Sequence, residues 1–120
     1  MKMPISEIID RYTITKLKSE RTSENVIEEL NFYKKELDDY KVNLDKYIQL
    51  MYNINGKIWD TESDIRKGTN LPLEDIGRLA LKVRDLNCER NGIKADIVDQ
   101  FSEGFKEIKI NYKKINYGRN

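Results

Sequence analysis

Histidine is absent from this 120-residue sequence, and cysteine occurs only once. Without histidine the chain lacks the commonest general base and metal ligand, and a lone Cys88 can form neither an intramolecular disulfide nor a thiolate metal site. Zinc, haem and Ser-His or Cys-His catalysis are therefore excluded, and we expect no cofactor and no bound metal. A carboxylate-rich site for a hard cation such as magnesium would be the one remaining alternative.

Long apolar runs are also missing, because 36% of the residues are charged and only 38% are hydrophobic. No segment approaches the length of a membrane span or of the apolar core of a signal peptide, so we expect a cytoplasmic protein without membrane contact. Two prolines and six glycines favour long polar-faced helices over loops. At this length we expect a single domain over residues 1–120.

The net charge of +1 is unevenly distributed, with two basic ends and an acidic middle. In the C-terminal extension, residues 104–120, lysines alternate with aromatic and aliphatic residues. Such a tail could bind phosphates, but a solvated terminus is the commoner explanation, so nucleic acid is not an expected partner. Its apolar spacing fits alternation or a helical stripe, and we favour a helix.

The strongest pattern is a heptad seam between residues 26 and 65, in which apolar residues alternate at spacings of four and three. Ser23 is a candidate N-cap, and Gly68 followed by Pro72 is typical of a helix end with a left-handed residue. The seam predicts one continuous helix over residues 23–67, roughly 65 Å long. Its members are Val26, Leu30, Tyr33, Leu37, Tyr40, Leu44, Tyr47, Met51, Ile54, Ile58 and Ile65.

A second apolar stripe, from Leu73 to Phe101, predicts a return helix over residues 72–103 after a turn at 68–71. Isoleucines near the N-terminus predict a short amphipathic helix over residues 6–20, laid across the hairpin. The expected fold class is therefore all-α, a long antiparallel coiled-coil-like hairpin with a short N-terminal helix. Because one short helix cannot cover so long a seam, we expect a homo-oligomer.

Two polar stripes follow helical spacing, one on each arm of the predicted hairpin. The first contains Asn55, Trp59, Glu62 and Arg66, and the second contains Asn87, Arg90 and Lys94.

Arg90 stands where the apolar stripe of the return helix should continue, and a buried guanidinium is costly unless it is paired or stacked. Its partner could be Asp10 or Asp45, the ring of Tyr47, or a bound anion. Three cations converge in this projection while Glu62 is the only acid on either stripe, which favours the anion. Trp59 on its own is more often a core residue than a ligand platform.

Several segments along the chain form a pattern of short motifs. They are Ile8-Ile9-Asp10-Arg11-Tyr12-Thr13-Ile14 with Lys18 and Glu20-Arg21, Asn55 with Ile58-Trp59-Asp60 and Glu62, Asp64-Ile65-Arg66, Asn87, Arg90, Ile93-Lys94 and Phe101-Ser102-Glu103-Gly104. This pattern resembles an uncharacterised family of small helical proteins of phage and bacterial genomes, some of which lie beside or are fused to glycosyltransferases. The resemblance covers most of the chain and implies the fold more than any activity. Tyr12, Thr15 and Leu86 depart from the family pattern without touching its polar positions.

The candidate ligand-binding residues combine the motif positions with the tyrosine that the second stripe should face. They are Asp10, Thr13, Lys18, Tyr47, Asn55, Trp59, Glu62, Arg66, Asn87, Arg90 and Lys94. Arginine and lysine would take phosphates, and an aromatic ring would stack a base.

Three functions are compatible with these observations. The preferred one is a non-enzymatic oligomeric binding protein for a phosphate-bearing molecule. It would be similar in class to phage sponges that sequester nucleotide immune signals such as cyclic ADP-ribose derivatives or cyclic dinucleotides, and would then act in the host cytoplasm. The alternative is a structural or adaptor coiled coil that partners a glycosyltransferase or another protein. A magnesium-dependent nucleotide pyrophosphohydrolase is disfavoured, because Glu28-Glu29 and Asp96-x-x-Asp99 do not have the spacing of its carboxylates.

Overall fold

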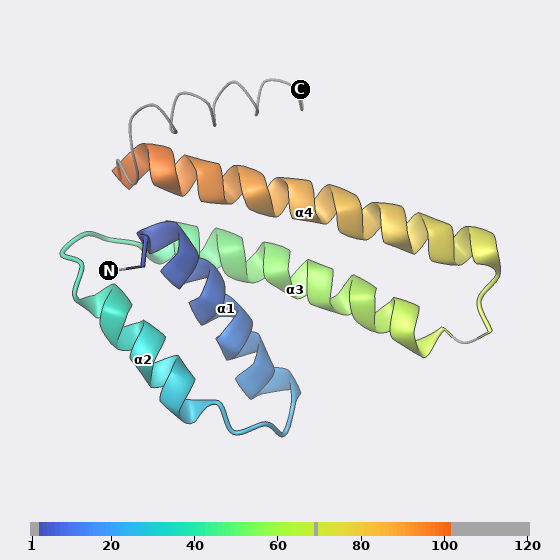
Figure 1. Ribbon diagram of the computed structural model, residues 1–120, viewed down its shortest axis with the longest axis horizontal. Helices are drawn as coiled ribbons and strands as arrows, with labels where there is room; N and C mark the ends of the chain where they lie inside the picture. Colours follow the sequence, from blue (N-terminus) through green and yellow to red (C-terminus); the bar gives the residue numbers. More distant parts are fainter. Residues whose placement is uncertain (1–2, 69, 102–120) are drawn as a thin grey trace.

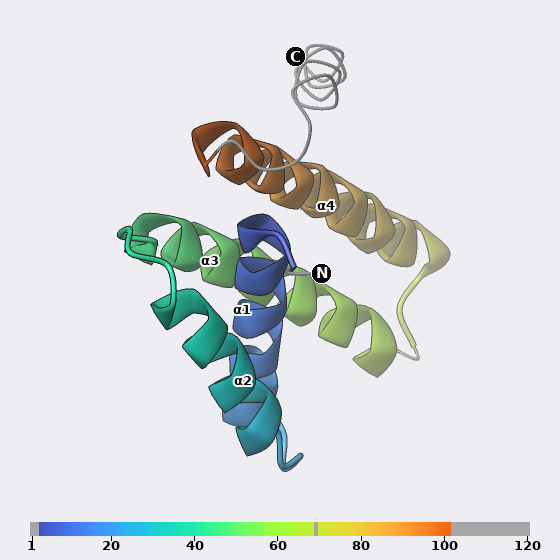
Figure 2. The same cartoon turned by 60° about the vertical axis from the view of Figure 1, so that its left-hand side comes forward.

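The computed structural model describes residues 3–68 and 70–101, which form four α-helices and no strand. They are α1 (Ile5–Arg21), α2 (Ile27–Asp38), α3 (Asp45–Lys67) and α4 (Leu73–Phe101). Helices α3 and α4 form an antiparallel hairpin, and α1 and α2 pack at one end of it (Figure 1 and Figure 2). The all-α class is therefore confirmed. None of the helices in the described ranges is long and apolar enough to cross a membrane.

The predicted continuous helix over residues 23–67 is wrong, because the chain leaves the helix after Asp38 and re-enters it at Asp45. Aspartate and asparagine side chains compete with helical hydrogen bonds, and several of them gather at this point. Asn43 Oδ1 accepts the N–H of Asp45 at 2.9 Å and so fixes the start of α3. Asn25 Oδ1 accepts the N–H of Ile27 at 3.3 Å in the same way, so α2 starts after the predicted cap Ser23.

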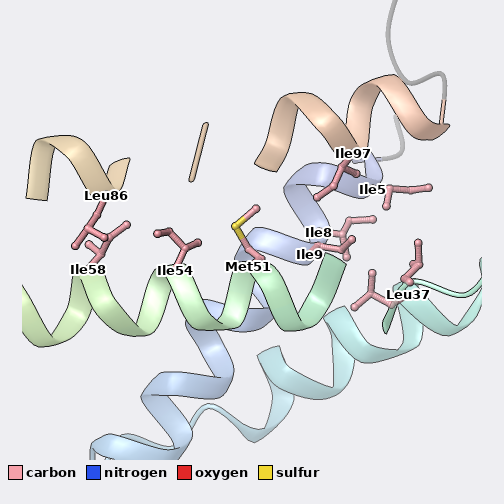
Figure 3. Packing of buried hydrophobic residues seen from close by; sticks show 10 residues of the cluster. Ile5, Ile8, Ile9, Leu37, Met51, Ile54, Ile58, Leu86 and Ile97 are labelled. Carbon is pink, nitrogen blue, oxygen red and sulfur yellow. The ribbon is translucent and has the colours of Figure 1, made fainter. Parts of the chain in front are cut away.

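The break lets α2 fold onto α1, and α1 in turn crosses α3, so that one copy of the chain buries most of the heptad seam. Val26, Leu37, Leu44, Met51, Ile54 and Ile58 are all no more than 7% exposed. Figure 3 shows Ile8 and Ile9 of α1 beside Met51, and Ile58 against Leu86 of α4. The expectation that this seam needs a second copy is therefore wrong over residues 26–58.

The predicted turn and the beginning of the return helix are confirmed. Gly68 donates its N–H to the Ile65 carbonyl at 3.3 Å, and the Leu71 N–H donates to the Gly68 carbonyl at 3.1 Å. Gly68 has φ −87°, so it is not the left-handed residue expected from the sequence. The Pro72 carbonyl accepts the first hydrogen bonds of α4. The end of the predicted return helix and the C-terminal extension lie outside the described residues.

The hairpin continues past the point where α1 crosses it, and we call this part, residues 59–68 and 70–85, the distal arm (Figure 1). Ile65, Leu79 and Val83 are only half-buried there. Leu73 and Leu81 are 86% and 51% exposed. The distal arm is therefore one of the places where a single copy leaves apolar surface uncovered, and Ile27, Phe32, Val42 and Leu50 are exposed elsewhere in the described chain.

Candidate functional site

Three buried polar side chains meet where α1 crosses α3. The Asn55 amide nitrogen donates to Asp10 Oδ1 and to Thr13 Oγ1, both at 2.9 Å. The Thr13 hydroxyl in turn donates to the backbone carbonyl of Asp10 at 2.9 Å. These residues are at most 5% exposed. Spacing of three residues places Asp10 and Thr13 on one face of α1, which is why a single side chain of α3 can bind both.

Lys94 of α4 joins this group from the other side. Its Nζ lies 2.9 Å from Glu7 Oε2 and 3.5 Å from Asp10 Oδ2, and its side chain is 19% exposed. The hydrogen bond from Lys94 lowers the pKa of Glu7 below its usual range, against an opposing effect of burial, and Arg11 at 3.1 Å adds to the lowering. A charge at this depth requires such partners. We call Glu7, Asp10, Thr13, Asn55 and Lys94 the polar network, and it ties three helices together.

Arg90 lies one turn before Lys94 on α4, and its environment differs. Its Nε is fully buried and has no hydrogen-bond partner. No ion pair to Asp10 or Asp45 occurs in the described part of the chain, so the predicted carboxylate partners do not pair with Arg90. An unsatisfied buried donor is uncommon in folded proteins and calls for an explanation.

The direction in which Arg90 lies follows from the helical positions around it. Leu86 faces α3, where it packs on Ile58, whereas Lys94 reaches α1. Asn87 and Arg90 fall on the same flank of α4 as Lys94, given 3.6 residues per turn. Arg90 and Asn87 therefore lie on the flank of α4 from which Lys94 reaches α1. Away from this contact the ribbons of α1 and α4 diverge (Figure 1). We call the side of the molecule on which this flank lies the divergent side.

The first polar stripe and part of α1 border the same side. On α3, Gly56 faces α1, because a Cβ there would meet Leu17, and Ile58 faces α4. By the helical period, Asn55 and Trp59 lie between the face of α3 that contacts α1 and the face that contacts α4. On α1, Lys18 shares a flank with Glu7, since eleven residues correspond to about three turns. Trp59 and Lys18 are half-buried, and Lys18 has no ion pair among the described residues.

The predicted site residues thus separate into three sets. Asp10, Thr13, Asn55 and Lys94 are bonded to one another in the polar network. Lys18, Trp59, Asn87 and Arg90 border the divergent side, and Glu62 and Arg66 follow on the exposed part of α3.

Tyr47 packs its ring against Phe101, with 5.7 Å between ring centroids. One expectation about these residues is wrong. Lys94 is not a free cation, because Glu7 and Asp10 neutralise it. Sequence reasoning did not include Glu7 among the site residues. Its position one helical turn before Asp10 and Arg11 could have suggested that it belongs to the same group.

A hollow lies between the C-terminal end of α1 and α3, lined by Arg21, Tyr52, Gly56, Lys57 and Asp60 among others. Its polar groups are largely satisfied. Arg21 pairs with Asp60. The Tyr52 hydroxyl donates to Glu20, which raises the pKa of Tyr52. This hollow therefore lacks the unsatisfied donor that distinguishes the divergent side.

No group of three or more Asp, Glu or Cys side chains within residues 3–68 and 70–101 is arranged to hold a metal ion. Comparison with protein-family models, with curated proteins and with solved structures found no match, so the function has to be inferred from the site itself.

Proposed function

We propose that this protein is a non-enzymatic oligomeric binding protein for a phosphate-bearing small molecule, which binds on the divergent side through Arg90. The observation that carries the proposal is the buried, unpartnered Nε of Arg90. Lys18, Asn87 and Trp59 border the same side and would complete the site.

The free energy of an unsatisfied buried donor gives the proposal its physical basis. Leaving such a group without an acceptor costs about 1–3 kcal/mol, and more when the group is charged. A rotation of the partly exposed Arg90 side chain would bring its buried Nε within reach of a ligand. A phosphate oxygen would then accept the Nε–H while a second oxygen takes an Nη–H, the two-point geometry in which guanidinium binds oxyanions most strongly. Lys18 would add a second positive charge, because it has no carboxylate partner within the described residues.

The polar network supports binding rather than catalysis. Both of its carboxylates are engaged by Lys94, and Asp10 also accepts from Asn55. Groups held in this way fix the angle between α1 and α4 and are poorly placed to move protons. A rigid arrangement of the two helices lowers the ordering cost of binding.

Among phosphate-bearing molecules a nucleotide fits this composition best, because the half-buried Trp59 would offer an indole face to a base beside the cations. Cyclic ADP-ribose derivatives and cyclic dinucleotides, the signals that phage sponges sequester, are the nucleotides to test first. A bound signal would be held rather than converted.

An adaptor that binds another protein, such as a glycosyltransferase, is the second candidate. It is favoured by the exposed leucines of the distal arm, Leu73 and Leu81. Exposed apolar patches of this kind mark protein interfaces more often than small-molecule sites.

Thermal unfolding with a panel of nucleotides and inorganic pyrophosphate tests the ligand proposal. A ligand at a hundred times its dissociation constant should stabilise the wild type by about 2.7 kcal/mol. Arg90→Ala should stay folded, since it removes an unsatisfied donor, and should lose this stabilisation. The matched control Lys82→Ala, an exposed cation of the same helix, should keep it.

Two results would overturn the proposal. One is a wild type whose melting temperature no member of the panel moves. The other is an Arg90→Ala variant that is stabilised as much as the wild type.

A further inference from the structure

We infer that the outer face of α4 in the distal arm binds a second copy of this chain in antiparallel orientation. This surface lies on the far side of α4 from α3 and is separate from the divergent side. The residues that form it are Leu73, Gly77, Leu81 and Arg84.

The face follows from the helical period. Leu86 packs on Ile58 of α3, and positions 73, 77, 81 and 84 lie about half a turn away from it around the helix axis. Leu73 is 86% exposed and Leu81 is 51% exposed, the first being the most exposed large apolar residue of the described chain. Two exposed leucines on one helix face are unfavourable in water, and burying them against a partner would lower the free energy.

Gly77 leaves open space in the middle of this face. A Cβ at this position would meet no atom within 4 Å. Glycine is a poor helix former in a helix interior, and packing within the chain does not require it here. The space above Gly77 is therefore available to a side chain from outside.

The pattern is complementary to itself, which identifies a second copy as the occupant. A two-fold axis at position 79 places Leu81 of each copy over Gly77 of the other. The same axis places Arg84 opposite Glu74 of the second copy. Both side chains could make this contact, because their pairs within the described residues are exposed: Arg84 with its neighbour Asp85 at 3.3 Å, and Glu74 with Arg78 at 3.7 Å.

Charge balance supports the same occupant. Within residues 73–85, three acidic side chains are matched by three basic ones, so two copies meet without net repulsion. Glu74 and Arg84 are ten residues apart and come opposite each other only when the two helices are antiparallel.

Sedimentation equilibrium of the full chain tests the inference. The wild type should have twice the 14.2 kDa mass of the chain. Gly77→Gln fills the space that Leu81 of the second copy needs, and should raise the dimer dissociation constant at least about tenfold. It should not lower the melting temperature of the monomer, since the new side chain meets no atom of its own chain.

Charge reversal supplies the matched control. Glu74→Arg and Arg84→Glu should each weaken the dimer, because each places like charges opposite each other. The double variant should restore it, because residues 74 and 84 of the two copies then carry opposite charges again. Leu50→Gln, at an exposed leucine of α3, should leave the dimer unchanged.

A monomeric wild type, a Gly77→Gln variant that dimerises as the wild type does, or a double variant that fails to recover would each overturn the inference. A monomeric wild type would also correct the oligomeric state in the proposed function. Phosphate binding is tested separately, by the ligand-induced stabilisation of the wild type and its loss in Arg90→Ala, so the two failures are distinguishable.

Discussion

The crossing of α1 over α3 depends on Asn55 more than on any other polar side chain of the described network. Asn55 is 5% exposed and donates two hydrogen bonds of 2.9 Å, one of them to the carboxylate of Asp10. The change Asn55→Ala removes both bonds and leaves Asp10 Oδ1 buried without a donor. Lys94 still reaches the other oxygen of that carboxylate, at 3.5 Å.

The magnitude follows from these two bonds. A neutral hydrogen bond contributes about 0.5–1.5 kcal/mol and one to a charged group about 1.5–3 kcal/mol, so we expect a loss of about 2–4 kcal/mol. Domains of this size have about 5–15 kcal/mol of stability in total. The melting temperature should therefore fall by roughly 8–32 °C, at about 4–8 °C per kcal/mol.

Urea unfolding followed by circular dichroism measures this loss. Asn53→Ala is the matched control, because Asn53 is exposed on the same helix and accepts only from Gln49 at 2.9 Å. It should change the stability by no more than about 0.5 kcal/mol. If Asn55→Ala cost no more than Asn53→Ala, the network would not hold the helices as described.

Three further predictions follow from the described contacts. Lys94 lowers the pKa of Glu7 below 4.5, so the stability that this pair contributes is present above pH 4.5 and is lost as the pH falls below it. The urea midpoint of Glu7→Gln should therefore depend less on acid pH than that of the wild type. Identical pH profiles of the two proteins would contradict this prediction. Gly56→Ala should raise the stability by about 0.5–1 kcal/mol, because alanine is a better helix former than glycine. The new methyl meets Arg21 at 3.5 Å and Leu17 at 3.9 Å, both ordinary van der Waals contacts. A lower urea midpoint than that of the wild type would disprove this. Glu20→Gln should bring the raised pKa of the Tyr52 phenol, measured by its ultraviolet titration, back toward 10.0; an unchanged titration would show that the hydrogen bond is not its cause.

The parts of the fold that local signals determine could be predicted from the sequence. The N-terminal helix and the return helix each carry a one-sided apolar stripe, and Gly68 with Pro72 marks the turn between the arms of the hairpin. The polar stripes placed Asn55 and Lys94 among the candidate residues, because polar residues on an otherwise apolar face need a partner.

The break between α2 and α3 could not be read from the heptad pattern. Leu37 of α2, Leu44 just before α3 and Met51 of α3 keep their spacing across it because all three reach the same core. Only weak signals mark the break, chiefly Asp38 and Asn43, whose side chains favour turns.

The partners of buried charges also lay beyond sequence reasoning. Glu7 and Lys94 are separated by 87 residues, and the helical period alone does not show that α1 brings them together. Arg90 presents the opposite case. Its unusual position in an apolar stripe was visible in the sequence, and the lack of a partner emerged only from the packing.

Native mass spectrometry of the wild type and of Arg90→Ala, each incubated with the same panel of cyclic and linear nucleotides, tests the central claim most directly. We predict wild-type ions that carry the added mass of one panel member on each 14.2 kDa chain, and Arg90→Ala ions without it. Wild-type ions that retain no nucleotide, or the same added mass on both proteins, would contradict a phosphate site at Arg90.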